Sequence, residues 1–154
     1  MALEFRRAEP GLAAALGSFL RELAAGGDEE QFHPHPLDDA AAREVCDYAG
    51  ADVYLVGLDG DDVVAYGMLR GWDAGFAVPS LGIAVRASAR GRGIGRALMD
   101  RLHEEAAARG AARVRLRTHP DNVAALRLYR SLGYGFDGEE EGQLVGILEL
   151  RSRP

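Results

Sequence analysis

A segment rich in glycine and arginine, residues 81–96, has the residue types and spacing of a phosphate-binding site. It reads LGIAV-RASA-RGRGIGR, so an apolar stretch enters a loop with three glycines that opens directly into a helical pattern. Glycine lets a ligand approach the backbone closely, and the first turn of a helix presents unpaired N–H groups with partial positive charge. Arg90, Arg92 and Arg96 add full charges that suit a pyrophosphate. The segment therefore predicts an anion site at a helix start.

Other interpretations of this segment fit the residues less well. An ordinary strand-to-helix turn with exposed arginines is the simplest alternative. A P-loop needs Gly-Lys-Ser/Thr after its glycines, and the chain contains no lysine. A dinucleotide fingerprint needs glycine at the sixth position of G-x-G-x-x-G, but counting from Gly91 or Gly93 reaches Arg96 or Leu98.

A second pair of residues, Asn122 and Tyr129, lies further along the chain. They are seven residues apart, which is two helical turns, so both point to one face of the expected helix. A phenol at this place can donate a proton to a leaving group. The alternative is that Tyr129 only packs, with its hydroxyl at the surface.

The elements that position these residues follow from the periodicity of apolar side chains. Asp-Gly at residues 59–60 between two apolar runs predicts a hairpin. Helices are expected at 12–23, 37–48, 93–108 and, capped by Asp121, 122–132; strands are expected at 2–8, 52–58, 63–70, 81–85, 114–118, 134–136 and 144–150. The order is β-α-α-β-β-β-α-β-α-β-β. Hairpins before a βαβ unit predict an α/β (α+β) fold with a mixed, mostly antiparallel sheet of six to seven strands and about four helices.

Composition limits the class of protein. The 154 residues, 47% of them hydrophobic, suit a single domain over 1–154. A net charge of −6 argues against broad nucleic-acid binding. No apolar run approaches the length of a membrane span and no secretory signal is visible, so a cytoplasmic protein without membrane association is expected. The single cysteine, Cys46, excludes an internal disulfide and is expected to be a buried structural thiol.

Together the two motifs resemble the GNAT (GCN5-related) N-acetyltransferase superfamily. The run Arg90–Gly95 is similar to its pyrophosphate loop, Gln/Arg-x-x-Gly-x-Gly/Ala. Asn122, Ala125, Tyr129 and Gly133-Tyr134 match its Asn-x-x-Ala-x-x-x-Tyr-x-x-x-Gly-Phe/Tyr pattern. The clear resemblance covers roughly residues 79–136.

The resemblance implies an acetyltransferase that uses acetyl-CoA as cosubstrate and no metal. A bulge in the fourth strand would splay it from the fifth, so that the thioester enters between them. Asn122 would hydrogen-bond the pantetheine arm, and Tyr129 would protonate the leaving thiolate as the catalytic residue. The cofactor-binding residues so implied are Ile83, Ala84, Val85, Arg90, Gly91, Arg92, Gly93, Ile94, Gly95, Arg96, Asn122 and Tyr129.

The acceptor and the general base are less well defined. Relatives resembling ribosomal-protein acetyltransferases carry Glu five residues before the Asn, where this chain has Arg117. The alternatives are water or one of four side chains, namely His33, His35, Asp73 and His119. We expect the acceptor, a small-molecule or peptide amine, near residues 32–37 and 70–73. Trp72 and Phe76 would either line a pocket there or pack at the sheet edge.

Three hypotheses follow from the sequence. The first is an active acetyltransferase acting on a primary amine by direct attack in a ternary complex. The second is a non-catalytic acyl-CoA-binding or regulatory domain, and the third is a different nucleotide-binding α/β protein. A homodimer is also a reasonable expectation, with the final strand, residues 143–151, as a candidate edge.

Overall fold

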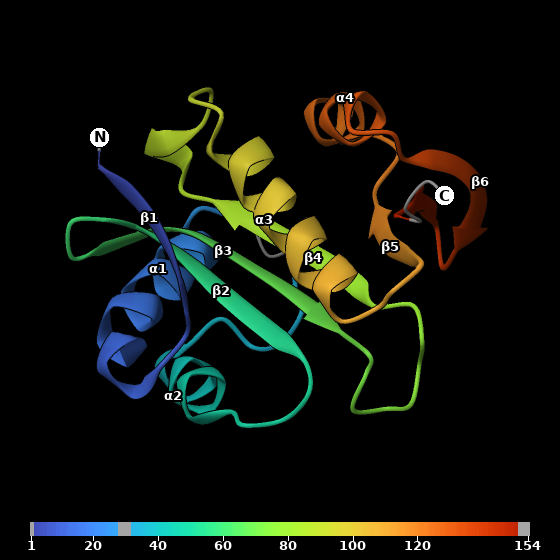
Figure 1. Cartoon of the computed structure of the whole chain (residues 1–154). Helices are drawn as coiled ribbons and strands as arrows, with labels where there is room; N and C mark the ends of the chain where they lie inside the picture. Colours follow the sequence, from blue (N-terminus) through green and yellow to red (C-terminus); the bar gives the residue numbers. More distant parts are fainter. Residues whose placement is uncertain (1, 28–31, 151–154) are drawn as a thin grey trace.

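The computed structural model describes residues 2–27 and 32–150. Its described part contains a seven-stranded sheet and four α-helices (Figure 1). The strands are β1 (Leu3–Arg7), β2 (Val53–Asp59), β3 (Asp62–Arg70), β4 (Ser80–Val85), β5 (Arg113–Thr118), β6 (Gly135–Glu140) and β7 (Gln143–Glu149). The helices are α1 (Ala13–Ala25), α2 (Asp39–Asp47), α3 (Ile94–Ala108) and α4 (Val123–Ser131). The α/β fold class expected from the sequence is confirmed.

The sheet runs β1-β2-β3-β4-β5-β7-β6, and only β4 and β5 pair in parallel. These two strands share a single paired position, Ser80 with Arg115, and then diverge. The splay expected between the fourth and fifth strands is therefore present. The bulge expected in β4 is absent from the β3–β4 pairing, because the register runs without a shift from Ala65↔Val85 to Arg70↔Ser80.

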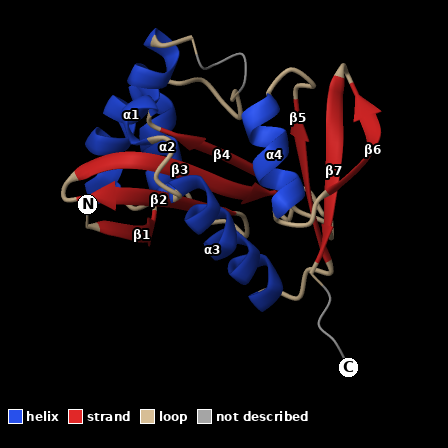
Figure 2. Cartoon of the chain, turned by 90° about the horizontal axis from the view of Figure 1, so that it is seen from above, coloured by secondary structure: helices blue, strands red, loops and turns tan. Residues whose placement is uncertain are grey.

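Helices cover both faces of the sheet (Figure 2). The helices α1 and α2 pack on one face of β2 and β3, around Phe19, Leu20 and Tyr66. On the opposite face, α3 packs closely against β3. A Cβ added at Gly67 of β3 would lie only 2.9 Å from Leu102 Cδ1, so this contact requires glycine. The helix α4 packs on this same side. Both faces of β3 are thus buried, which explains its continuous apolar sequence.

Several local expectations are corrected by the structure. Asn122, not Asp121, caps α4, because its side chain accepts a hydrogen bond from the Ala125 N–H at 3.3 Å. The final connection is a two-residue turn, Glu141-Gly142, rather than the longer connection expected between strands at 134–136 and 144–150. The last strand is not an edge, because β7 lies between β5 and β6. Arg151 of that expected edge lies outside the described residues.

Three other local expectations, a helix at 37–48, a hairpin around residues 59–60 and a buried Cys46, are confirmed. The helix is α2, which Asp38 caps by accepting a hydrogen bond from the Ala41 N–H at 2.8 Å. Asp59 pairs with Asp62 around Gly60, which has a φ of +64°. Cys46 is a buried free thiol, and burial raises its pKa. None of the helices in the described part of the chain is both long and apolar enough to cross a membrane.

Candidate functional site

A cleft of about 1100 Å³ lies where β4 and β5 diverge. Its walls come from β4, the loop after it, the first turn of α3, β5, α4, the segment before α2 and the end of β6. These elements are far apart in sequence but are brought together by the parallel pair at the centre of the sheet. The cleft therefore joins the glycine-arginine segment to a second region near residues 32–34.

The loop at the carboxyl end of β4 needs glycine at two positions. Gly91 and Gly93 have φ values of +79° and +78°, which place them in the left-handed region that other residues rarely adopt. Gly93 is the N-cap of α3, so the first N–H groups of that helix open toward the cleft. The loop is anchored where it begins, because Arg86 forms two hydrogen bonds to Glu22 of α1, at 2.9 and 3.0 Å.

Two of the three arginines in this loop line the cleft. Arg90 lines it and donates from Nε to the Val85 carbonyl at 3.1 Å. Arg96 lines it from the first turn of α3 and donates to the Ser131 hydroxyl of α4. Arg92 is exposed and lies outside the lining. The positive charge at this end of the cleft thus comes from Arg90, Arg96 and the helix start.

The helix α4 brings Asn122 and Tyr129 to the same wall, as their spacing predicted. The Tyr129 ring lies 5.9 Å from the Tyr134 ring, centroid to centroid. Burial raises the pKa of Tyr129 to about 12. The phenol therefore keeps its proton at neutral pH and remains a hydrogen-bond donor at the cleft wall.

Of the sequence-predicted cofactor-binding residues, all except Arg92 line this one cleft. They are Ile83, Ala84, Val85, Arg90, Gly91, Gly93, Ile94, Gly95, Arg96, Asn122 and Tyr129. The four candidate bases separate by position. His33 and His119 line the cleft, whereas His35 and Asp73 do not.

The two candidates outside the lining have structural partners. His35 contacts the buried Tyr66 hydroxyl through Nε2 at 2.8 Å, and burial lowers its pKa. Asp73 accepts from the Tyr48 hydroxyl and from the Ala51 N–H. The hydrogen bond from Tyr48 is the main cause that lowers the pKa of Asp73. These contacts give His35 and the exposed Asp73 structural partners outside the cleft lining.

Comparison with known proteins decides the family. The model described as "Acetyltransferase (GNAT) family" matches residues 19–134. The chain belongs to the GNAT acetyltransferase family. This GNAT protein is an acetyl-CoA-dependent N-acetyltransferase, which removes the hypothesis of a different nucleotide-binding α/β protein.

Individual relatives agree with this assignment. The chain is 34% identical to "Streptothricin acetyltransferase" of Streptomyces lavendulae, over 93% of this chain and 87% of that protein. A GCN5-related N-acetyltransferase structure from Kribbella flavida matches with a TM-score of 0.78 and 27% identity, over 96% and 98% of the two chains. The structure of yncA from Salmonella typhimurium with acetyl-CoA matches with a TM-score of 0.75 and 21% identity, over 100% and 97% of the chains.

The GNAT cleft also contains residues that the sequence reasoning did not assign to a site. The polar ones include Ser80, Arg115, Thr118, Glu140 and Gln143. The arginines of β5 alternate with Val114 and Leu116, and this alternation predicted only a strand with one polar face. Among the described elements, no helix packs on the face of β5 that carries these arginines, so Arg115 and Arg117 line the cleft. Trp72 and Phe76 lie outside the lining, and Arg109 stacks on the Trp72 ring at 5.1 Å.

Within the described residues, no group of three or more His, Cys, Asp or Glu side chains could hold a metal ion.

Proposed function

We propose that this GNAT enzyme transfers the acetyl group of acetyl-CoA to a primary amine by direct attack, with both substrates in the cleft together. The observation that carries the proposal is the single cleft at the β4–β5 splay, which joins the anion-binding loop, Tyr129 and a separate region around residues 32–34. A cytoplasmic location and a homodimer stay predictions.

The residues at the carboxyl end of β4 fit the donor. The N–H groups at Gly91–Gly95 and the charges of Arg90 and Arg96 would hold its pyrophosphate. Among the described residues, no strand pairs with the β5-facing edge of β4 after Ser80, so the backbone groups of that edge before Val85 would be available to the amide groups of the pantetheine arm. Bound there, acetyl-CoA supplies an activated acetyl group as a thioester.

The reaction needs no covalent enzyme intermediate. The amine nitrogen forms a bond to the acetyl carbon, the carbon–sulfur bond breaks, and the thiolate leaves with the electron pair. The amine loses one proton before attack and one as the amide forms. Holding both reactants in one cleft supplies much of the rate, since effective molarities of oriented groups are large.

Tyr129 is the proposed donor to the leaving sulfur. With a pKa of about 12 it is a weaker acid than a thiol, whose ordinary pKa is about 8.5. Complete transfer of the Tyr129 proton to the thiolate is therefore unfavourable, by a pKa difference of about 3. Hydrogen-bond donation to the developing charge is the role that fits this phenol best.

The protons of the amine must pass to another group in the cleft. His33 and His119 are the two of the four candidate side chains that line it, and each could accept a proton directly or through water. Glu140 is the only carboxylate among the described lining residues, but it is paired with two arginines. We propose water relayed by His33 or His119 as the proton acceptor.

The acceptor is tested by measuring thiol release from acetyl-CoA with a panel of primary amines. The panel includes streptothricin, because a relative carries that name, together with amino acids, aminosugars, polyamines and peptide N-termini. We expect intersecting initial-rate patterns when both substrates are varied, as a ternary complex requires. Parallel patterns, or CoA binding without turnover of any amine, would contradict the proposal; the latter result would favour a non-catalytic acyl-CoA-binding domain.

A further inference from the structure

The charge of the cleft is opposite to that of the chain. The chain has a net charge of −6. The described cleft residues nevertheless include one carboxylate, Glu140, and five arginines: Arg70, Arg90, Arg96, Arg115 and Arg117. Arg90 and Arg96 belong to the proposed pyrophosphate loop, whereas Arg70, Arg115 and Arg117 come from β3 and β5.

Arg70 and Arg115 lie at the end of β4 that is away from the pyrophosphate loop. Ser80 at the start of β4 pairs with Arg70 on one side and Arg115 on the other. The loop begins only after Val85, at the other end of the strand. At about 3.3 Å per residue, the two ends of β4 are roughly 17 Å apart. Arg70 and Arg115 therefore flank a different part of the cleft.

The three side chains lie on one face of the sheet. Met68 and Tyr66 share the face of Arg70, and both pack with α1 and α2. Leu116 packs in the core formed by α3, so its neighbours Arg115 and Arg117 point to the opposite face, the side of Arg70. Only the small Ser80 separates Arg70 from Arg115 across the three strands, so their long side chains can converge on one group.

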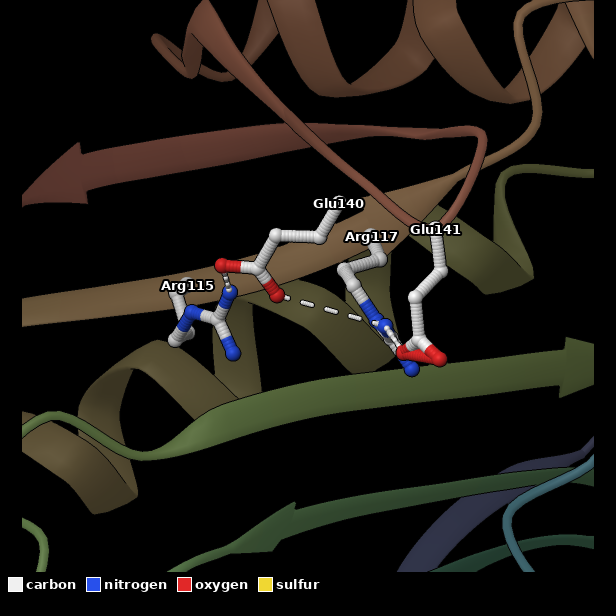
Figure 3. Close-up of polar contacts among 4 residues, drawn as sticks. All are labelled: Arg115, Arg117, Glu140 and Glu141. Carbon is white, nitrogen blue, oxygen red and sulfur yellow. Dashed lines mark hydrogen bonds and ion pairs between the residues drawn. The ribbon is translucent and has the colours of Figure 1, made fainter.

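The two β5 arginines are already partly neutralised. Arg115 pairs with Glu140 at 2.9 Å, and Arg117 pairs with Glu141 at 3.1 Å and Glu140 at 3.9 Å. Figure 3 shows the Glu140 carboxylate between the two guanidinium groups. Both glutamates come from the tip of the β6–β7 hairpin. The hairpin therefore balances Arg115 and Arg117 but leaves the charge of Arg70.

The guanidinium group of Arg70 has no ion-pair or hydrogen-bond partner among the residues that the structure describes, although the residue is partly buried. A guanidinium has five donors, and removing it from water without a partner is costly. Its charge is close enough to His35 to help lower the pKa of that imidazole. The half of the cleft away from the pyrophosphate loop therefore has an excess of positive charge around Arg70.

We propose that the acceptor is an amine that also carries a carboxylate, as a small amino acid does, and that Arg70 with Arg115 binds this carboxylate. The inference rests on the proposed function, because it concerns the second substrate of the same cleft. Binding the carboxylate at the start of β4 would leave the amine free to point along the splay toward the thioester. A fork of guanidinium donors matches the planar carboxylate.

The test uses matched acceptors with the full chain and acetyl-CoA. Thiol-release rates would be compared for amino acids and their carboxamides, for example leucine against leucinamide, and expressed per neutral amine. We expect kcat/KM to be about 30-fold higher for the acids, the range of a charge-assisted hydrogen bond. Arg70→Ala should reduce this acid-to-amide ratio to about 1, and Arg70→Lys should restore part of it.

The control is Arg101→Ala, an exposed arginine of α3 outside the cleft lining, which should leave the ratio unchanged. A wild-type preference for amides, or an acid-to-amide ratio that survives Arg70→Ala in a folded variant, would overturn the inference while the proposed function stands. Absence of thiol release with every amine would overturn both. The binding of an N-acetylated amino acid and of its amide to the CoA complex, measured by calorimetry, gives the same comparison without turnover.

Discussion

The two halves of the cleft are built differently. The donor half comes from one continuous stretch, β4 through the start of α3, with α4 beside it. The acceptor half gathers side chains from β3, β5, the segment at residues 32–34 and the β6–β7 hairpin. The donor half depends on backbone conformation and local spacing, whereas the acceptor half depends on which strands are neighbours. Substitutions in the two halves should therefore have different effects.

The largest effect is expected at Tyr129, where the two halves meet. Tyr129→Phe removes the hydrogen-bond donor at the sulfur and should lower kcat about 100-fold. The Kd for CoA, measured by calorimetry, should stay within about 3-fold, because the ring still packs beside Tyr134. A variant with unchanged kcat would assign Tyr129 to packing alone.

A pair of glycines tests the backbone requirement of the donor half. Gly93 and Gly110 both have left-handed φ values, +78° and +82°, but only Gly93 lines the cleft. Alanine at either position should cost about 1 kcal/mol of stability, a shift in Tm of about 2–4 °C. Only Gly93→Ala should also weaken CoA binding, by about 30-fold. Equal CoA affinity in the two variants would show that the loop conformation is not needed for binding.

The raised pKa of Tyr129 predicts a pH dependence of stability. The folded phenol titrates near 12, whereas an exposed one titrates near 10. Between these values the unfolded chain has lost the proton that the folded chain keeps, so this stabilising contribution is complete below pH 10 and is lost as pH rises to 12. Between pH 10 and 12, the free energy of unfolding of Tyr129→Phe should therefore fall by about 2 kcal/mol less than that of the wild type. Urea unfolding at pH 9.5 and 11.5 measures the difference, and identical losses would contradict the assigned burial.

The smallest effect is expected at the hairpin of the acceptor half. Glu141 has a φ of +50°, which a non-glycine side chain rarely adopts. Its ion pair with Arg117 is exposed and contributes little. Asparagine tolerates this conformation better in a two-residue turn, so Glu141→Asn should raise stability by a few tenths of a kcal/mol. A lower Tm would mean that the pair with Arg117 is worth more than the turn strain.

The same contrast explains what the sequence could predict. The α/β order, the loop at residues 90–96 and the Asn122–Tyr129 pair follow from local patterns, and the structure brings these residues to one cleft. Arg70 lies in the region expected for the acceptor, but its place near Arg115 depends on the order β3-β4-β5. The place of Glu140 depends on β7 lying between β5 and β6, and no local pattern encodes either order. Residue type alone nominates the four candidate bases. The sequence therefore does not separate His35 and Asp73, whose hydrogen-bond partners lie outside the cleft lining, from His33 and His119.

We propose that donor and acceptor occupy opposite ends of the β4–β5 splay, and a crystal structure of the chain with CoA would test this. We expect the pyrophosphate on the N–H groups of Gly91–Gly95 and the pantetheine arm along the open edge of β4. The sulfur should lie beside the Tyr129 hydroxyl, and the region around Arg70 should be left free for the acceptor. A pantetheine arm outside the splay, or a pyrophosphate bound by Arg70 and Arg115, would contradict it.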